Sequence, residues 1–335
     1  MTKKDRVISA ISYCESSGIP HNIELCSELS AAVCERLSIK KDELFDMLGN
    51  HIEKVGFNRG NETNGIFIDE YGVQWDRTGM DKEIGIIKNP VLKDVDLSGY
   101  VFPKIDFDFV RETTRKLLNN GRDTFKLGKI GTALFERAWS LRGFENFLMD
   151  IACEEDFVSE SLEQITEFNL KIIDTALEFD LDGFYFGDDY GQQNGLLINP
   201  VTWRSLIKPN LAKMFAAVKS KGKVVALHSC GDISLILDDL IEIGLDVYQT
   251  FQPEIYDLKS IKQRYGKSLT FWGGISTQQT LPFVSPSELV KIVRETAEIM
   301  GNGGGYIAAP THQVPFDVSV ENVLALAEIF KELEK

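Results

Sequence analysis

The sequence predicts an α/β protein, specifically a (β/α)8 TIM barrel with an N-terminal helical extension and a β-rich insertion. From residue 124 to the end of the 335-residue chain, six short apolar runs alternate with segments of helical periodicity. Strands and helices that alternate with short links form parallel sheets joined by right-handed crossovers. Two further strand candidates upstream bring the expected number to eight. No G-x-G-x-x-G motif follows the first strand, which favours a closed barrel over an open dinucleotide-binding sheet.

Residues 1–55 are expected to form the helical extension, within a single barrel domain that spans residues 1–335. Amphipathic periodicity predicts helices over 3–17, 27–37 and 41–48, and the short segment 19–25 is a candidate first barrel strand.

Residues 56–104 form the β-rich insertion, because they are rich in Gly, Asn, Asp and aromatic residues. Within them, the segment 66–75 predicts a hairpin or a strand that turns at residues 70–72. Such a region is either a lid that shapes a pocket or a β insertion packed on the surface, and the sequence leaves both open.

Residues 105–335 contain the regular βα units. The predicted strands are 124–130, 184–186, 222–230, 247–251, 269–272 and 306–309. The predicted helices are 108–119, 145–152, 156–179, 200–220, 234–243, 286–300 and 320–333. The glycine-rich run 301–305 precedes its strand instead of following it, so it is expected to form a turn at the non-catalytic face and not a phosphate loop.

The composition restricts partners and compartment. Lysine and arginine total 36 against 51 acidic residues, a net charge of −15, and this argues against a nucleic-acid or anionic-membrane surface. The five cysteines are scattered without C-x-x-C spacing, as in a reduced, cytoplasmic protein. No signal-peptide core is present, and no apolar run approaches the ~18 residues of a membrane helix. A homodimer is a possible assembly.

His228 and Cys230 are the central candidate ligands of a metal site. They end the run 222–230, and residues two apart on a strand point to the same face. An imidazole and a thiolate side by side suit zinc. The alternative is a buried thiol beside a core histidine. The metal hypothesis gains weight from position, because the carboxyl ends of barrel strands are where such enzymes carry their chemistry.

Other polar residues also follow predicted strands. They are Glu136, Asp188 with Asp189 and Tyr190, Gln252, and His312. His312 can approach from the last strand as a third metal ligand, and three protein ligands with one open position are typical of catalytic zinc. Asp188 and Glu136 are candidates for a fourth ligand, a proton donor or a partner that orients a histidine. Tyr190 and Gln252 complete the candidate catalytic set. For Asp188 and Asp189, helix capping and loop solvation are the alternative.

The segment 228–231, His-Ser-Cys-Gly, resembles the H-x-C-G motif of the methyl-transferring branch of the uroporphyrinogen decarboxylase superfamily, and the resemblance extends over nearly the whole chain. It implies that His228 and Cys230 bind Zn²⁺. In that branch the third ligand is commonly a last-strand cysteine, whereas here His312 takes that place and no cysteine follows Cys230. Asp188 falls at the position of the strand-end aspartate of the decarboxylase. The arginine-rich segment with which the decarboxylase binds its substrate's carboxylates is not found.

The resemblance therefore favours a zinc-dependent methyltransferase that moves a methyl group between a small methoxy, thiol or amine substrate and a corrinoid (cobalamin) carried by a partner protein. One alternative is a metal-free decarboxylase of a small carboxylated substrate, with Asp188 steering protonation. Another is a non-catalytic barrel that docks a corrinoid protein or another partner.

Overall fold

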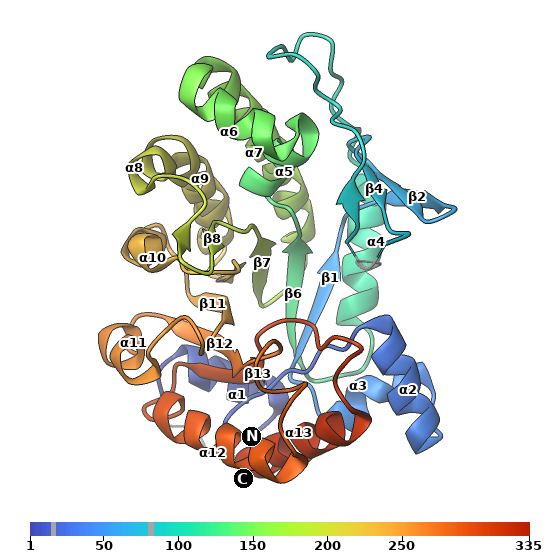
Figure 1. The fold of residues 1–335 in the computed structure, drawn as a ribbon, viewed down its shortest axis with the longest axis vertical. Helices are drawn as coiled ribbons and strands as arrows, with labels where there is room; N and C mark the ends of the chain where they lie inside the picture. The colour runs from blue at the N-terminus through green and yellow to red at the C-terminus, as the bar shows by residue number, and fades with distance from the viewer. Residues whose placement is uncertain (15–17, 80–83) are drawn as a thin grey trace.

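The computed structural model describes residues 1–14, 18–79 and 84–335. Its centre is a seven-stranded parallel sheet. In sheet order, the strands are β1 (Ile52–Gly56), β6 (Phe125–Ile130), β7 (Gly183–Gly187), β10 (Val224–His228), β11 (Val247–Phe251), β12 (Thr270–Ile275) and β13 (Tyr306–Pro310). Figure 1 shows these strands inside a layer of helices. The six strands predicted from residue 124 onward are all present, each beside the next along the chain.

The segment 20–25 fills the gap between the first and last strands. His21 forms a parallel bridge with Ala308 of β13, and on its other side its carbonyl accepts the His51 N–H at 3.1 Å. The Asn50 side chain adds two hydrogen bonds to the backbone of Ile23, at 2.7 and 2.9 Å. The predicted first strand is therefore an irregular segment held by isolated bridges and a side-chain amide. With the seven regular strands it gives a TIM-barrel-like α/β fold.

Strand β1 is a feature that the sequence analysis missed. Its inward-facing Lys54 interrupts the apolar pattern by which a buried barrel strand is normally identified. The predicted hairpin belongs to a separate antiparallel sheet and not to the barrel. That sheet contains β2 (Gly60–Thr63), β3 (Ile66–Asp69), β4 (Gln74–Asp76) and β5 (Ile86–Ile87). The turn between β3 and β4 is where it was predicted, and Gly72 adopts φ +86° in it.

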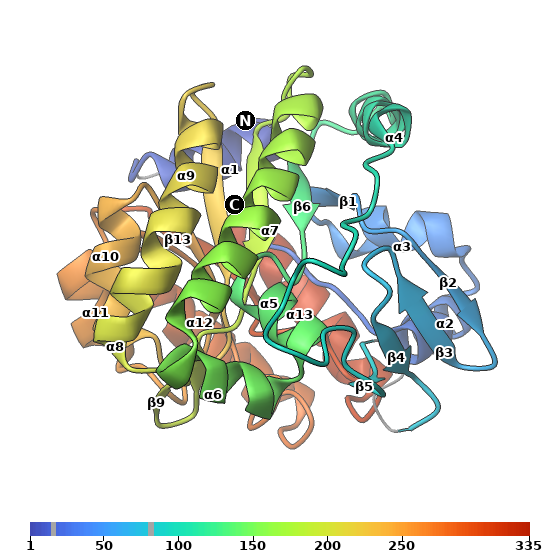
Figure 2. The ribbon, with the colours of Figure 1, turned by 90° about the horizontal axis from the view of Figure 1, so that it is seen from above.

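Helices surround the sheet. They are α1 (Lys3–Ile11), α2 (Ser27–Leu37), α3 (Lys41–Leu48), α4 (Phe107–Leu118), α5 (Phe135–Arg142), α6 (Phe144–Cys153), α7 (Glu155–Ala176), α8 (Pro200–Thr202), the π-helical η1 (Trp203–Ile207), α9 (Lys208–Lys219), the 3-10 turn η2 (Ser234–Ile236), α10 (Leu237–Glu242), α11 (Leu258–Tyr265), α12 (Pro286–Met300) and α13 (Val320–Leu333). Of these helices, α1 packs its Val7 side chain against the inward-facing residues of the strands. A short hairpin, β8 (Gly191–Gln192) and β9 (Gly195–Leu196), follows β7. Figure 2 shows α7 and α9 next to each other, outside the strands.

Two sequence expectations about local structure can be compared with these bounds. The helix expected over 3–17 ends at Ile11, because Tyr13 takes a left-handed φ of +53° that a helix does not allow; residues 15–17 lie outside the described part of the chain. The run 301–305 forms the predicted turn between α12 and β13, with φ between +67° and +76° at Gly303, Gly304 and Gly305.

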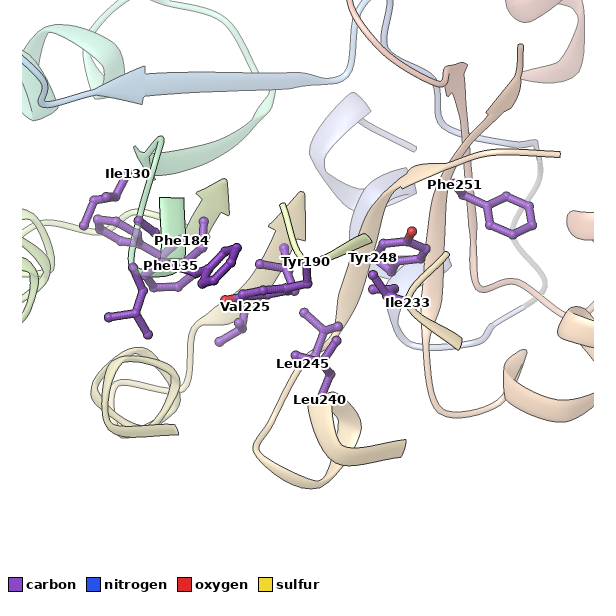
Figure 3. Packing of buried hydrophobic residues seen from close by; sticks show 14 of the residues in the cluster. Ile130, Phe135, Phe184, Tyr190, Val225, Ile233, Leu240, Leu245, Tyr248 and Phe251 are labelled. Carbon is purple, nitrogen blue, oxygen red and sulfur yellow. The ribbon is translucent and has the colours of Figure 1, made fainter. Parts of the chain in front are cut away.

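The apolar core has two parts, separated by the sheet. Val225 and Leu227 of β10 face the helices, and Figure 3 shows Val225 among aromatic side chains such as Phe184, Phe135 and Tyr190. Ala226, between them in the sequence, faces the barrel interior with Tyr185 and other residues. Because strand side chains alternate, His228 continues the inward-facing row begun by Ala226. The strand therefore delivers an imidazole to the open end of the barrel.

Within the described residues, no helix has both the length and the apolar character needed to cross a lipid bilayer.

Candidate metal centre

The structure brings together the three residues that the sequence predicts as metal ligands. One ligand atom from each of His228, Cys230 and His312 lies within 4.8 Å of the others. His228 is the last residue of β10, Cys230 lies two residues beyond it, and His312 follows β13. The Cys230 Sγ is 3.5 Å from His228 Nε2, and the two imidazole rings are 5.4 Å apart between centroids. The side chains thus converge at the carboxyl ends of the barrel strands.

Gln249 determines which nitrogen of His228 faces this cluster. The Gln249 Oε1 accepts the Tyr185 hydroxyl at 2.7 Å and lies 2.5 Å from His228 Nδ1. An amide oxygen only accepts hydrogen bonds, so Nδ1 carries the proton and Nε2 presents its lone pair beside Cys230. Burial lowers the pKa of His228 to about 4 and keeps the ring neutral at neutral pH. An oriented, neutral imidazole of this kind is what a metal ligand requires.

The turn after His228 is fixed by two side chains from neighbouring strand ends. Asp189 accepts the Cys230 N–H at 2.8 Å, and Gln252 accepts the Gly231 N–H at 2.9 Å. Gln252, predicted as a catalytic candidate, therefore lies against the backbone of the turn. Burial, and then the Asp189 carboxylate, raise the pKa of the Cys230 thiol above its ordinary value. A cation beside the sulfur would reverse that effect.

Asp188 and Tyr190 lie next to this cluster but bond to other groups. The Asp188 carboxylate accepts the N–H groups of Phe135 and Glu136 at 2.9 and 2.7 Å, at the start of α5, and the Tyr190 hydroxyl at 2.6 Å. The helix-capping alternative therefore describes what Asp188 contacts. The carboxylate nearer the candidate ligands is that of Asp189, whose Oδ1 is 3.6 Å from His228 Nε2.

Glu136, on the first turn of α5, faces both aspartates. Burial, followed by the charges of Asp189 and Asp188, raises the pKa of Glu136 well above its usual range. Burial also raises the pKa of Asp188, to about 6. Like charges that share a buried site favour retention of a proton. This group of carboxyls can therefore store a proton at neutral pH, next to the candidate metal ligands.

The barrel interior below the cluster contains charged groups that sequence reasoning missed. Lys54 Nζ lies 2.6 Å from Glu24 and 4.4 Å above the Tyr185 ring, and Lys129 Nζ lies 5.8 Å from the same ring. Burial and the nearby Lys54 ammonium lower the pKa of Lys129. Strand alternation could have indicated that these side chains face the barrel interior. Lys54, Lys129 and Gln249 each lie two residues beyond an apolar, inward-facing residue of the same strand.

The fold and the donor set together describe a TIM-barrel-like protein with a candidate metal centre at the carboxyl ends of its strands. The comparison with protein families gives a more specific assignment. The model of the family "Uroporphyrinogen decarboxylase (URO-D)" matches residues 74–333, which is more than half of the chain. The chain therefore belongs to the uroporphyrinogen decarboxylase family, as the H-x-C-G segment led us to expect.

Curated relatives include both methyltransferases and decarboxylases. The chain is 28% identical over 171 residues to the methylcobamide:CoM methyltransferase MtaA of Methanosarcina barkeri, covering 51% of this chain and 48% of that protein. It is 23% identical over 181 residues to the uroporphyrinogen decarboxylase of Geobacillus thermodenitrificans, a match that covers 50% of this chain and 51% of that protein. The chain thus spans about half the length of the curated relatives it matches. A solved methyltransferase from Methanosarcina mazei shares the fold, with a TM-score of 0.75 and 17% identity over 99% of both chains.

Proposed function

We propose that this protein is a zinc-dependent methyltransferase that moves a methyl group between a small methylated substrate and a corrinoid. The observation that carries the proposal is the convergence of His228, Cys230 and His312, with the lone pair of His228 already turned toward the sulfur. Two nitrogens and one sulfur form a donor set suited to Zn²⁺, and three protein ligands leave one position for substrate.

The residues around the ligands support this chemistry. A zinc ion held by the three side chains would act as a Lewis acid toward a thiol, methoxy or amine group. Gln249 keeps the His228 ring in place, and Asp189 holds the backbone of Cys230. Glu136, whose pKa is raised by burial and by two neighbouring aspartates, holds a proton that it can give to the leaving heteroatom.

The corrinoid part of the proposal is supported by the relatives. A methylcobamide:CoM methyltransferase is similar to this chain over 51% of its length. We infer that the corrinoid is carried by a separate protein that docks at the barrel mouth, and that the methylated substrate is a small molecule. The five cysteines are free thiols, which supports a reducing, cytoplasmic location.

Metal analysis of purified wild-type protein and a His228→Ala/Cys230→Ala variant tests the proposal. The variant is expected to bind one zinc fewer per chain and to lose methyl transfer to cob(I)alamin. The transfer is measured by the change in absorbance of the cobalamin. Cys153→Ala is the matched control, because Cys153 is an exposed thiol away from the cluster. It should keep both the metal and the activity.

Two results would contradict the proposal. One is full methyl transfer by protein that a strong chelator has freed of zinc. The other is release of CO₂ from a carboxylated substrate, unaffected by chelator and independent of any corrinoid, which would identify a decarboxylase instead.

A further inference from the structure

A second group of potential metal ligands lies at the opposite end of the barrel, where the strands begin. His21 belongs to the segment that closes the ring, His51 immediately precedes β1, and Glu334 follows α13. One ligand atom from each lies within 4.8 Å of the others. Both histidines are completely buried. Figure 1 shows the two chain ends close together in this part of the molecule.

The backbone determines the tautomer of His21. Its Nε2 lies 3.1 Å from the carbonyl oxygen of Leu48, which only accepts hydrogen bonds, so Nε2 carries the proton. Nδ1 then presents a lone pair. Among the described residues no hydrogen-bond donor reaches this nitrogen, and it faces Glu334 Oε1 at 3.4 Å. In the described part of the chain, no hydrogen-bond donor lies between this lone pair and the carboxylate oxygen.

His51 is oriented in the same way. Arg6 Nη1 lies 3.3 Å from His51 Nε2, and a guanidinium only donates, so Nε2 carries the lone pair. The proton is therefore on Nδ1, which lies 3.2 Å from the carbonyl oxygen of His21 and, less closely, 3.4 Å from the backbone nitrogen of His21. His51 Nε2 is also 4.0 Å from Glu334 Oε1. Each imidazole thus donates its other N–H to a backbone carbonyl, which is the arrangement that normally orients metal-binding histidines.

Arg6 places a positive charge against two of these acceptors. It contacts His51 Nε2, and its Nη1 is 3.6 Å from Glu334 Oε2. It does not satisfy His21 Nδ1. Lys3 and Lys331 also lie close enough to affect His21 electrostatically, so a cation at this place must be bound by strong ligands.

We propose that His21 Nδ1, His51 Nε2 and the Glu334 carboxylate bind a divalent transition metal ion of the zinc class. Ligand atoms around a tetrahedral zinc are about 3.3 Å apart when the Zn–N distance is about 2.0–2.1 Å. The His21–Glu334 distance of 3.4 Å is close to this value, whereas His51 Nε2 and Glu334 Oε1, 4.0 Å apart, would move slightly closer on binding the ion. The site is structural: it fastens the end of α13 to the segment that closes the barrel. It is independent of the proposed methyl transfer.

The test uses the His228→Ala/Cys230→Ala protein, in which the other candidate site is removed. After treatment with chelator and return of zinc alone, this protein is expected to bind one zinc per chain and to melt at a higher temperature than its metal-free form. Adding Glu334→Gln should weaken zinc binding by at least about tenfold. Mutation of a residue that only hydrogen-bonds to a metal ligand already lowers metal affinity by that amount. Glu332→Gln, in an exposed pair with Arg294, is the matched control.

Two further measurements distinguish zinc bound at this site from zinc bound elsewhere. Arg6→Gln removes the competing cation and should tighten zinc binding. Cobalt substituted at this site should show no sulfur-to-metal charge-transfer band, because no thiolate is among the ligands, whereas cobalt at the His228 and Cys230 site should show one. The proposal is overturned if the double variant binds no zinc, or if Glu334→Gln and Glu332→Gln bind zinc equally well.

Discussion

Gly231 shows how one residue shapes the candidate metal centre. It follows Cys230 directly, has φ +79°, and packs so closely on β8 that an added Cβ would lie 2.3 Å from the Gly191 carbonyl carbon. No side chain fits this space, and only glycine adopts this backbone angle without strain. The small residue is therefore part of the geometry that turns the Cys230 sulfur toward His228.

Gly231→Ala is expected to lower the free energy of unfolding by more than about 2 kcal/mol, because it combines backbone strain with a steric clash. Gly222→Ala is the control, since Gly222 has φ +67° but open space around the added Cβ. It should cost only about 1 kcal/mol, the backbone contribution alone. Urea denaturation of both variants measures the difference, and equal losses would show that the contact with β8 is unimportant.

At the scale of elements, a buried ion pair fastens the antiparallel sheet to the barrel. Arg137 of α5 and Asp69 of β3 are 2.6 Å apart, and their side chains are 2% and 4% exposed. Asp69 also accepts the indole N–H of Trp75 at 3.1 Å, and the guanidinium lies 4.0 Å from the Tyr71 ring centroid. The insertion at 56–104 is therefore anchored at this point by its own side chains.

Arg137→Met should destabilise the protein by about 3–5 kcal/mol, because it leaves the Asp69 charge buried without its partner. The double variant Arg137→Met/Asp69→Asn should recover part of this loss, since it removes the unpaired charge as well. Arg264→Met, in the exposed pair of Arg264 with Asp238, should change stability by less than about 1 kcal/mol. Chemical denaturation gives all three values, and a small effect of Arg137→Met would exclude the anchoring role.

At the scale of the whole molecule, closure of the barrel depends on a segment with little regular structure. The ring is completed by the bridge between His21 and Ala308 and by the His51 N–H bond to His21. The Asn50 side chain pairs with both backbone groups of Ile23, as a neighbouring strand would do. The place where the first and last strands of the barrel meet is therefore the least regular part of the barrel.

Asn50→Ala should lower the free energy of unfolding by about 1–3 kcal/mol, because two buried backbone groups lose their partners. Amide hydrogen exchange should speed up first at Ile23, whose N–H the Asn50 side chain accepts. Asn302→Ala, in the exposed turn before β13, is the control and should leave that amide unchanged. If exchange at Ile23 does not respond, the side-chain amide is not needed for closure.

Regular features of the fold could be predicted from sequence because they depend on local pattern. The six strands after residue 124 are apolar runs separated by helices, and the turn at 301–305 is marked by its glycines. Strand β1 was missed because Lys54 faces inward, which a local pattern does not explain. The helix after Lys3 was predicted too long, because nothing in its periodicity indicates the left-handed residue Tyr13.

The sequence by itself determined the alternation of strands and helices and placed His228, Cys230 and His312 at strand ends, because hydrophobic periodicity and two-residue spacing are local properties. Only the tertiary structure decided what surrounds them. Gln249 orients His228, Asp189 rather than Asp188 faces it, and His21, His51 and Glu334 meet although they lie at opposite ends of the chain. Such contacts join distant segments, and their partners are chosen by strand register and barrel closure, which no local pattern encodes.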